Sequence, residues 1–106
     1  MKEMKVNKWK AKDNNGNDAD DSLLNMMNVL INNKKPEDFP KGLDNFRMFS
    51  RLSKAFEKAE QSGILQLEDV DYKFIKDSIV NDIPAVWGMN KNIVNALEEF
   101  MSAKDV

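Results

Sequence analysis

Four cationic side chains on one predicted helix are the residues of this 106-residue chain best suited to binding chemistry. Spaced 4, 3 and 4 residues apart, they are Arg47, Arg51, Lys54 and Lys58. At about 100° per residue, this spacing places them in one narrow arc of the helix surface. Such a face attracts phosphates or the carboxylates of a partner. The alternative is a solvated face, which the nearby Asp44 and Glu57 slightly favour.

Two tryptophans complete the candidate interaction surface. Trp87 lies between Pro84 and Gly88, and Trp9 lies among polar neighbours. Either side chain can cover the core or serve as an anchor for a partner, because Trp and Arg are enriched among binding hot spots. The core interpretation is favoured for Trp87, whereas the two interpretations are nearly balanced for Trp9.

The residue types that catalysis usually needs are scarce. The chain contains no histidine and no cysteine, which removes the commonest general base, the commonest metal ligand and thiol nucleophiles. The acid pairs Glu68–Asp69 and Glu98–Glu99 are sequence neighbours, so their side chains point to different helix faces. We interpret them as cap and surface residues, and we expect no catalytic site and no enzyme.

A calcium site is also not expected. Asp13, Asn15 and Asn17 resemble the first ligands of an EF-hand loop. The sixth position of that loop requires Gly but holds Asp18, and the twelfth requires Glu but holds Leu24. We therefore predict a polar loop over residues 13–20, with no metal and no cofactor.

Apolar periodicity predicts the elements that carry these side chains. Helices are expected from the acidic cap at residues 18–22 to about residue 33, over residues 43–63, over residues 68–81, and from residue 90 or 92 to about 101. Gly63 should end the central helix, whose regular turns are expected to start nearer residues 44–46. Its predicted core face consists of Phe46, Met48, Phe49, Leu52, Ala55, Phe56 and Ala59.

These elements predict a mainly α fold, a small bundle of about four helices. A short N-terminal β-strand, or a two-stranded ribbon from residues 4–11 and 64–67, can be added to it. We expect one domain, in which residues 1–17 form a basic strand or arm with a polar turn and residues 18–106 form the helical part. Residues 102–106 should fray, and a start at Met4 would make residues 1–3 dispensable.

Three segments resemble one group of known proteins. They are PEDFPKGLDNFRMFSRLSKAFEKAE, LQLEDVDYKFIKDSI and the WG of VWGMN. Together with the Asn- and Lys-rich usage, they resemble small uncharacterised helical proteins encoded in phage and prophage genomes, over residues 18–103. The resemblance implies an accessory protein that binds a host or virion protein or assembles with itself. It assigns no role to any single residue.

The leading hypothesis is a small non-enzymatic interaction protein that binds a protein partner, or a second copy of itself, through the basic helix face and the tryptophans. The alternative is a nucleic-acid-binding regulator that uses the same face with Lys5, Lys8 and Lys10. It is less favoured because the net charge is −2. No apolar run approaches the ~20 residues of a membrane span, so we expect no membrane partner and a cytoplasmic location, in the host cell if a phage encodes the protein.

Overall fold

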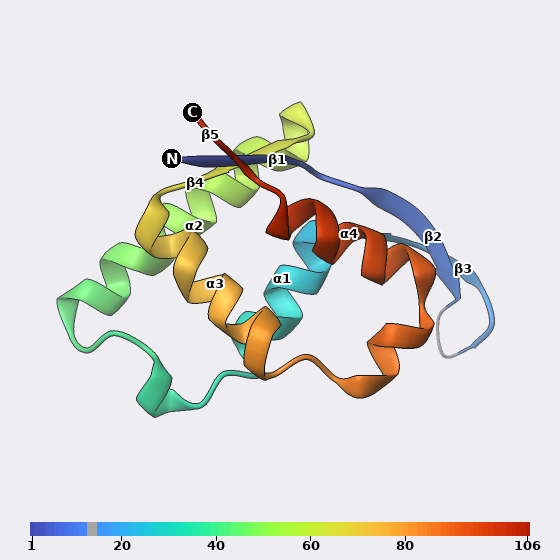
Figure 1. Cartoon of the computed structure of the whole chain (residues 1–106), viewed down its shortest axis with the longest axis horizontal. Coiled ribbons are helices and arrows are strands. Elements are labelled where there is room, and N and C mark those ends of the chain that lie inside the picture. The colour runs from blue at the N-terminus through green and yellow to red at the C-terminus, as the bar shows by residue number, and fades with distance from the viewer. Residues whose placement is uncertain (13–14) are drawn as a thin grey trace.

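A computed structural model of the chain describes residues 1–12 and 15–106. Figure 1 shows helices beneath and beside strands that run across one side of the molecule. The helices are α1 (Leu23–Asn32), α2 (Leu43–Ser62), α3 (Asp69–Asn81) and α4 (Lys91–Met101), with short 3-10 turns η1 (Pro36–Asp38) and η2 (Ala85–Met89). The strands are β1 (Lys2–Lys5), β2 (Lys8–Lys12), β3 (Asp18–Ser22), β4 (Ile64–Leu67) and β5 (Lys104–Asp105).

A three-stranded antiparallel sheet joins both ends of the chain. Its strand order is β4-β1-β5, so β1 lies in the middle. Lys2 lies opposite Leu67 and Met4 opposite Leu65 on one side, whereas Glu3 lies opposite Lys104 on the other. The two termini therefore lie side by side (Figure 1), and the N–H of Val106 donates to the carbonyl of Met1 over 2.9 Å. The expectation that residues 102–106 fray is wrong, because β5 pairs with β1.

A separate hairpin of β2 and β3 follows the sheet. Lys8 lies opposite Ser22, and Lys12 opposite Asp18, with Lys10 and Asp20 between them. Lys10 and Asp20 form an ion pair, and Lys12 and Asp18 form another at 2.7 Å. Opposite charges that face each other across an antiparallel pair stabilise it. The hydrogen bond from Lys10, more than its charge alone, lowers the pKa of the Asp20 carboxyl.

The predicted mainly α bundle is therefore wrong, because the fold is α+β with two antiparallel sheets. The expected pairing of residues 4–11 with 64–67 occurs only between β1 and β4. Residues 18–22, predicted as loop and helix cap, form β3, and only Ser22 caps α1, by accepting from the N–H of Asn25. Asp is a poor strand former, so cross-strand ion pairs outweigh local preference here. Asp13, with which the predicted polar loop begins, lies outside the described residues.

The core lies where α1, α3 and α4 meet the inner face of the three-stranded sheet. Its largest fully buried apolar side chains are Phe100, Leu23, Leu24, Met27, Leu65, Leu67 and Ile75. Tyr72 is buried against Phe100, with ring centroids 4.7 Å apart. None of the helices in the described part of the chain has both the length and the apolarity needed to cross a membrane.

The long helix α2 begins at Leu43, not nearer residues 44–46, and ends at Gly63 as predicted. Gly63 has φ of +76°, which a residue with a Cβ rarely adopts. The predicted apolar face is only partly buried: Met48 and Leu52 are buried, whereas Phe46 is 70% exposed and Phe49 is 38% exposed. The N-terminal turns of α2 lie at the edge of the molecule (Figure 1), so Phe46 faces solvent there whereas Met48 faces the core.

We predict that removing residues 1–3 destabilises the protein, which contrasts with their expected dispensability. The deletion removes backbone hydrogen bonds on both sides of β1. Because each contributes about 1 kcal/mol, the free energy of unfolding should fall by an amount on the order of 2–4 kcal/mol. Urea denaturation measures this loss. A variant with Lys2→Ala and Glu3→Ala keeps the backbone pairing, so its free energy of unfolding should decrease less. A truncated chain as stable as the full chain would contradict the prediction.

Tyr72 is the chain's one tyrosine, and its hydroxyl is held in the core. Its hydroxyl donates to the carbonyl of Phe100 over 2.8 Å, and burial raises its pKa above the ordinary 10.0. The stabilisation that the protonated Tyr72 hydroxyl gives is complete below pH 10. It is lost as the pH rises through the raised pKa of Tyr72, because the ionised oxygen cannot donate a hydrogen bond. Tyr72→Phe should cost about 1 kcal/mol at neutral pH.

The ultraviolet absorbance of tyrosinate reports this group alone. The native protein should titrate at a higher pH than the protein unfolded in urea. Coincident titration curves would show that the hydroxyl is not held in the native state as described.

Candidate functional site

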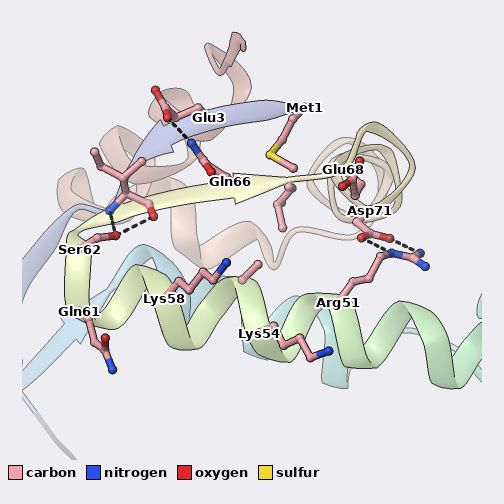
Figure 2. Close-up of a pocket in the computed structure, with 13 residues that line it drawn as sticks. Met1, Glu3, Arg51, Lys54, Lys58, Gln61, Ser62, Gln66, Glu68 and Asp71 are labelled. Atoms are coloured by element: carbon pink, nitrogen blue, oxygen red, sulfur yellow. Dashed lines mark hydrogen bonds and ion pairs between the residues drawn. The ribbon is translucent and has the colours of Figure 1, made fainter.

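A groove runs between the C-terminal half of α2 and the strand β4, with a volume of ≈ 670 Å³. Figure 2 shows α2 along one wall and β4 along the other. We call this site the α2–β4 groove. On the helix side its lining includes Arg51, Lys54, Ala55, Lys58 and Gln61, and on the sheet side Glu3, Ile64, Gln66, Leu67 and Glu68.

An ion pair closes one end of the groove. The Arg51 guanidinium donates two hydrogen bonds to the carboxylate of Asp71, each over 2.8 Å (Figure 2). Asp71 is only 1% exposed, and the hydrogen bonds from Arg51 satisfy both of its oxygens. The hydrogen bond to Asp71 is also the main reason that the pKa of Arg51 is raised. Arg51 therefore has a structural task and is only partly available to a ligand.

Two lysines remain on the helix wall. Lys54 and Lys58 are exposed, and neither forms an ion pair within residues 1–12 and 15–106. Figure 2 shows the Lys58 side chain turned toward β4 and the Lys54 side chain running along α2. The spacing of four residues puts both on the same side of the helix. Positive charge thus lies at the groove, and no carboxylate of the described residues forms an ion pair with it.

The opposite wall is polar and acidic. The Gln66 side-chain amide donates to Glu3 over 2.7 Å, which ties the exposed faces of β1 and β4 together. Glu68 follows at the end of β4 and contributes to the field that raises the pKa of Arg51. Partly exposed apolar side chains, Ala55 on the helix and Ile64 on the strand, also line the groove. The groove therefore separates positive charge on the helix from negative charge on the sheet.

The remaining predicted surface residues lie outside this groove. Arg47 pairs with Asp44 at 3.7 Å on the exposed part of α2. Trp9 in β2 lines a second hollow with the hairpin and Glu60, and Trp87 lies in η2, which packs beside α4. Both tryptophans are half-buried and pack against the core. The structure thus brings together Arg51, Lys54 and Lys58 of the six predicted residues.

Sequence reasoning missed the partner of Arg51. Asp71 belongs to the first turn of α3, where a carboxylate usually stabilises the helix N-terminus. A signal was available, because Asp71, Ile75 and Ser78 are spaced i, i+4 and i+7 and so share the buried face of α3. A carboxylate on a buried face requires a partner. No comparable signal identified β4 as one wall of a groove.

No group of three His, Cys, Asp or Glu residues suited to a metal ion occurs in the described part of the chain. Among the acid pairs considered, Asp69 contacts the N-terminal ammonium of Met1 at 3.2 Å, whereas Glu98 is exposed. Glu68 precedes α3 as its N-cap residue. Asp69 thus has a structural partner, Glu98 faces solvent and Glu68 lines the α2–β4 groove.

Comparison with protein-family models, with curated proteins and with solved structures finds no match to this chain.

We predict that Arg51 and Arg47 differ in their effect on stability. Arg51→Ala leaves the buried Asp71 carboxylate without its counter-charge, so Tm should fall by several degrees. Arg47→Ala removes only an exposed contact, so it should change the free energy of unfolding by about 0.5 kcal/mol or less. Thermal denaturation followed by circular dichroism measures both.

A double substitution separates charge from packing. Arg51→Met combined with Asp71→Leu removes both charges and keeps apolar volume, so it should recover most of the lost Tm. Equal decreases in Tm for Arg51→Ala and Arg47→Ala would show that the Arg51–Asp71 pair stabilises the fold no more than an exposed ion pair does.

Proposed function

We propose that this protein is a small non-enzymatic interaction protein that binds an acidic segment of a protein partner in the α2–β4 groove. The observation that carries the proposal is the position of Lys54 and Lys58 at the groove without an ion-pair partner in the described residues. Unpaired ammonium groups beside apolar surface offer a carboxylate both charge and partial desolvation.

Charge pairing elsewhere distinguishes this site from the other cationic segment. In the N-terminal hairpin, Lys10 and Lys12 each face an aspartate across the strands, whereas Lys5 and Lys8 form no ion pair within residues 1–12 and 15–106. Those pairs reduce the positive field that a nucleic acid would meet, because each neutralises one cation locally. The protein-binding function is therefore favoured over the nucleic-acid-binding alternative. A host or virion protein is the partner class that the resemblance to phage-encoded accessory proteins implies.

Charge reversal in the groove tests the proposal. The probe is a fluorescein-labelled peptide of alternating valine and glutamate, and binding is measured by fluorescence anisotropy. Lys54→Glu with Lys58→Glu should weaken binding by about tenfold or more, because attraction becomes repulsion. Arg51 is left unchanged so that Asp71 stays paired.

Lys35→Glu with Lys41→Glu is the matched control, because it changes the net charge equally at exposed lysines outside the groove. Its binding should stay close to that of the unchanged protein. No measurable binding of the peptide, or equal weakening by both double variants, would overturn the proposal. Stronger binding of a short DNA or RNA duplex than of the peptide would favour the nucleic-acid alternative instead.

A further inference from the structure

The edge of β4 that faces away from β1 is a second feature of the groove. In an antiparallel pair, residues alternate between those bonded to the neighbouring strand and those whose N–H and C=O point away from it. The N–H of Val6 donates to the carbonyl of Gly63 over 2.9 Å, so Gly63 is a position that bonds to β1. Every second residue after Gly63 is then also a bonded position. Leu65 and Leu67 therefore bond to β1, whereas Ile64 and Gln66 point their backbone groups outward.

A side chain already occupies the first of these outward positions. The Ser62 hydroxyl accepts from the N–H of Ile64 and donates to its carbonyl, each over 3.2 Å (Figure 2). This hydroxyl satisfies the same two groups that a neighbouring strand would satisfy. The two bonds also confirm that the backbone groups of Ile64 point away from β1.

Gln66 is the next outward position, and its backbone is left open. Within residues 1–12 and 15–106, no side chain or loop bonds to its N–H or C=O. At Glu68 the edge ends, because the carbonyl of Glu68 accepts from the N–H of Tyr72 over 2.9 Å as α3 begins. Gln66 lines the α2–β4 groove, so its open donor and acceptor border the space beside α2. An unpaired strand edge of this kind is a template for another strand.

We propose that the partner segment binds as a short extended strand added to the outer edge of β4, with acidic side chains at alternate positions directed toward Lys54 and Lys58. This inference rests on the proposed function and specifies its mode of recognition. Strand addition obtains affinity from main-chain hydrogen bonds and specificity from alternate side chains. The charge of the helix wall selects acidic residues on one side of the strand. On the other side, the carboxylate of Glu3 disfavours further acids, so uncharged residues fit there.

Backbone methylation of the peptide tests this mode. One version of the valine–glutamate peptide carries N-methyl groups on the valine amides, and a matched version carries them on the glutamate amides. Both keep the charge of the parent, and each blocks one edge of an extended strand. If the strand pairs antiparallel, the residue opposite Gln66 has its side chain on the same face of the sheet, so it is a valine. The valine-methylated peptide should then bind about tenfold or more weakly, whereas the glutamate-methylated peptide should bind like the parent.

The reverse order of the two affinities would indicate a parallel strand and would still support strand addition. Equal affinities of the two methylated peptides would overturn strand addition, whether both bind like the unmodified peptide or neither binds. If both are retained, the proposed function stands without the strand mode. If the unmodified peptide does not bind, the proposed function itself fails.

Two variants of the protein test the same edge. Gln66→Pro removes an N–H that points away from β1, so the sheet should persist while peptide affinity falls about tenfold. Ser62→Ala frees the backbone of Ile64 and lengthens the open edge, so peptide affinity should rise. Circular dichroism verifies that each variant is folded. Unchanged affinity in both folded variants, or in Ser62→Ala alone if Gln66→Pro does not fold, overturns the proposal.

Discussion

Pairing of β1 with strands on both sides is the constraint from which the rest of the sheet follows. Backbone groups of residues 2, 4 and 6 face β4, which leaves those of residues 1 and 3 for the C-terminal strand β5. The same alternation determines which backbone groups of β4 remain at the outer edge. A one-residue shift in register would turn Met4 and Leu65 out of the core, so burial and edge chemistry are coupled.

The charges of the basic helix face are divided between structure and recognition. Burial of Asp71 requires a counter-charge, and Arg51 supplies it across the junction of α2 and α3. A buried carboxylate without a partner would be costly. Lys54 and Lys58 lie on the same side of α2, but the sheet presents no carboxylate in contact with them. On this helix face, Arg51 thus stabilises the fold, whereas Lys54 and Lys58 remain available for binding.

The helices and the strand β4 over residues 64–67 were largely predictable, whereas β3 and β5 were not. Gly63 and Asn90 mark helix ends through local geometry, and Asn90 caps α4 by accepting from the N–H groups of Asn92 and Ile93. The strands β3 and β5 contain residues that form strands poorly, such as Asp20 and Asp105. Their conformation depends on partners elsewhere in the chain, namely Lys10 in the hairpin and Lys2 in β1. Local preference favours turns and frayed ends at those positions, and this is why a helical bundle was expected.

The sequence by itself determined the long central helix, its C-terminal stop and the spacing that gathers four cations on one face. These features depend on residues within about four positions of one another, so periodicity and capping reveal them. Only the tertiary structure decided which cation is paired and where the groove lies. Arg51 and Asp71 are 20 residues apart, and Glu3 and Gln66 are 63 apart. Contacts over such separations arise from the packing of whole elements, so a local pattern can show that Asp71 needs a partner but not which residue provides it.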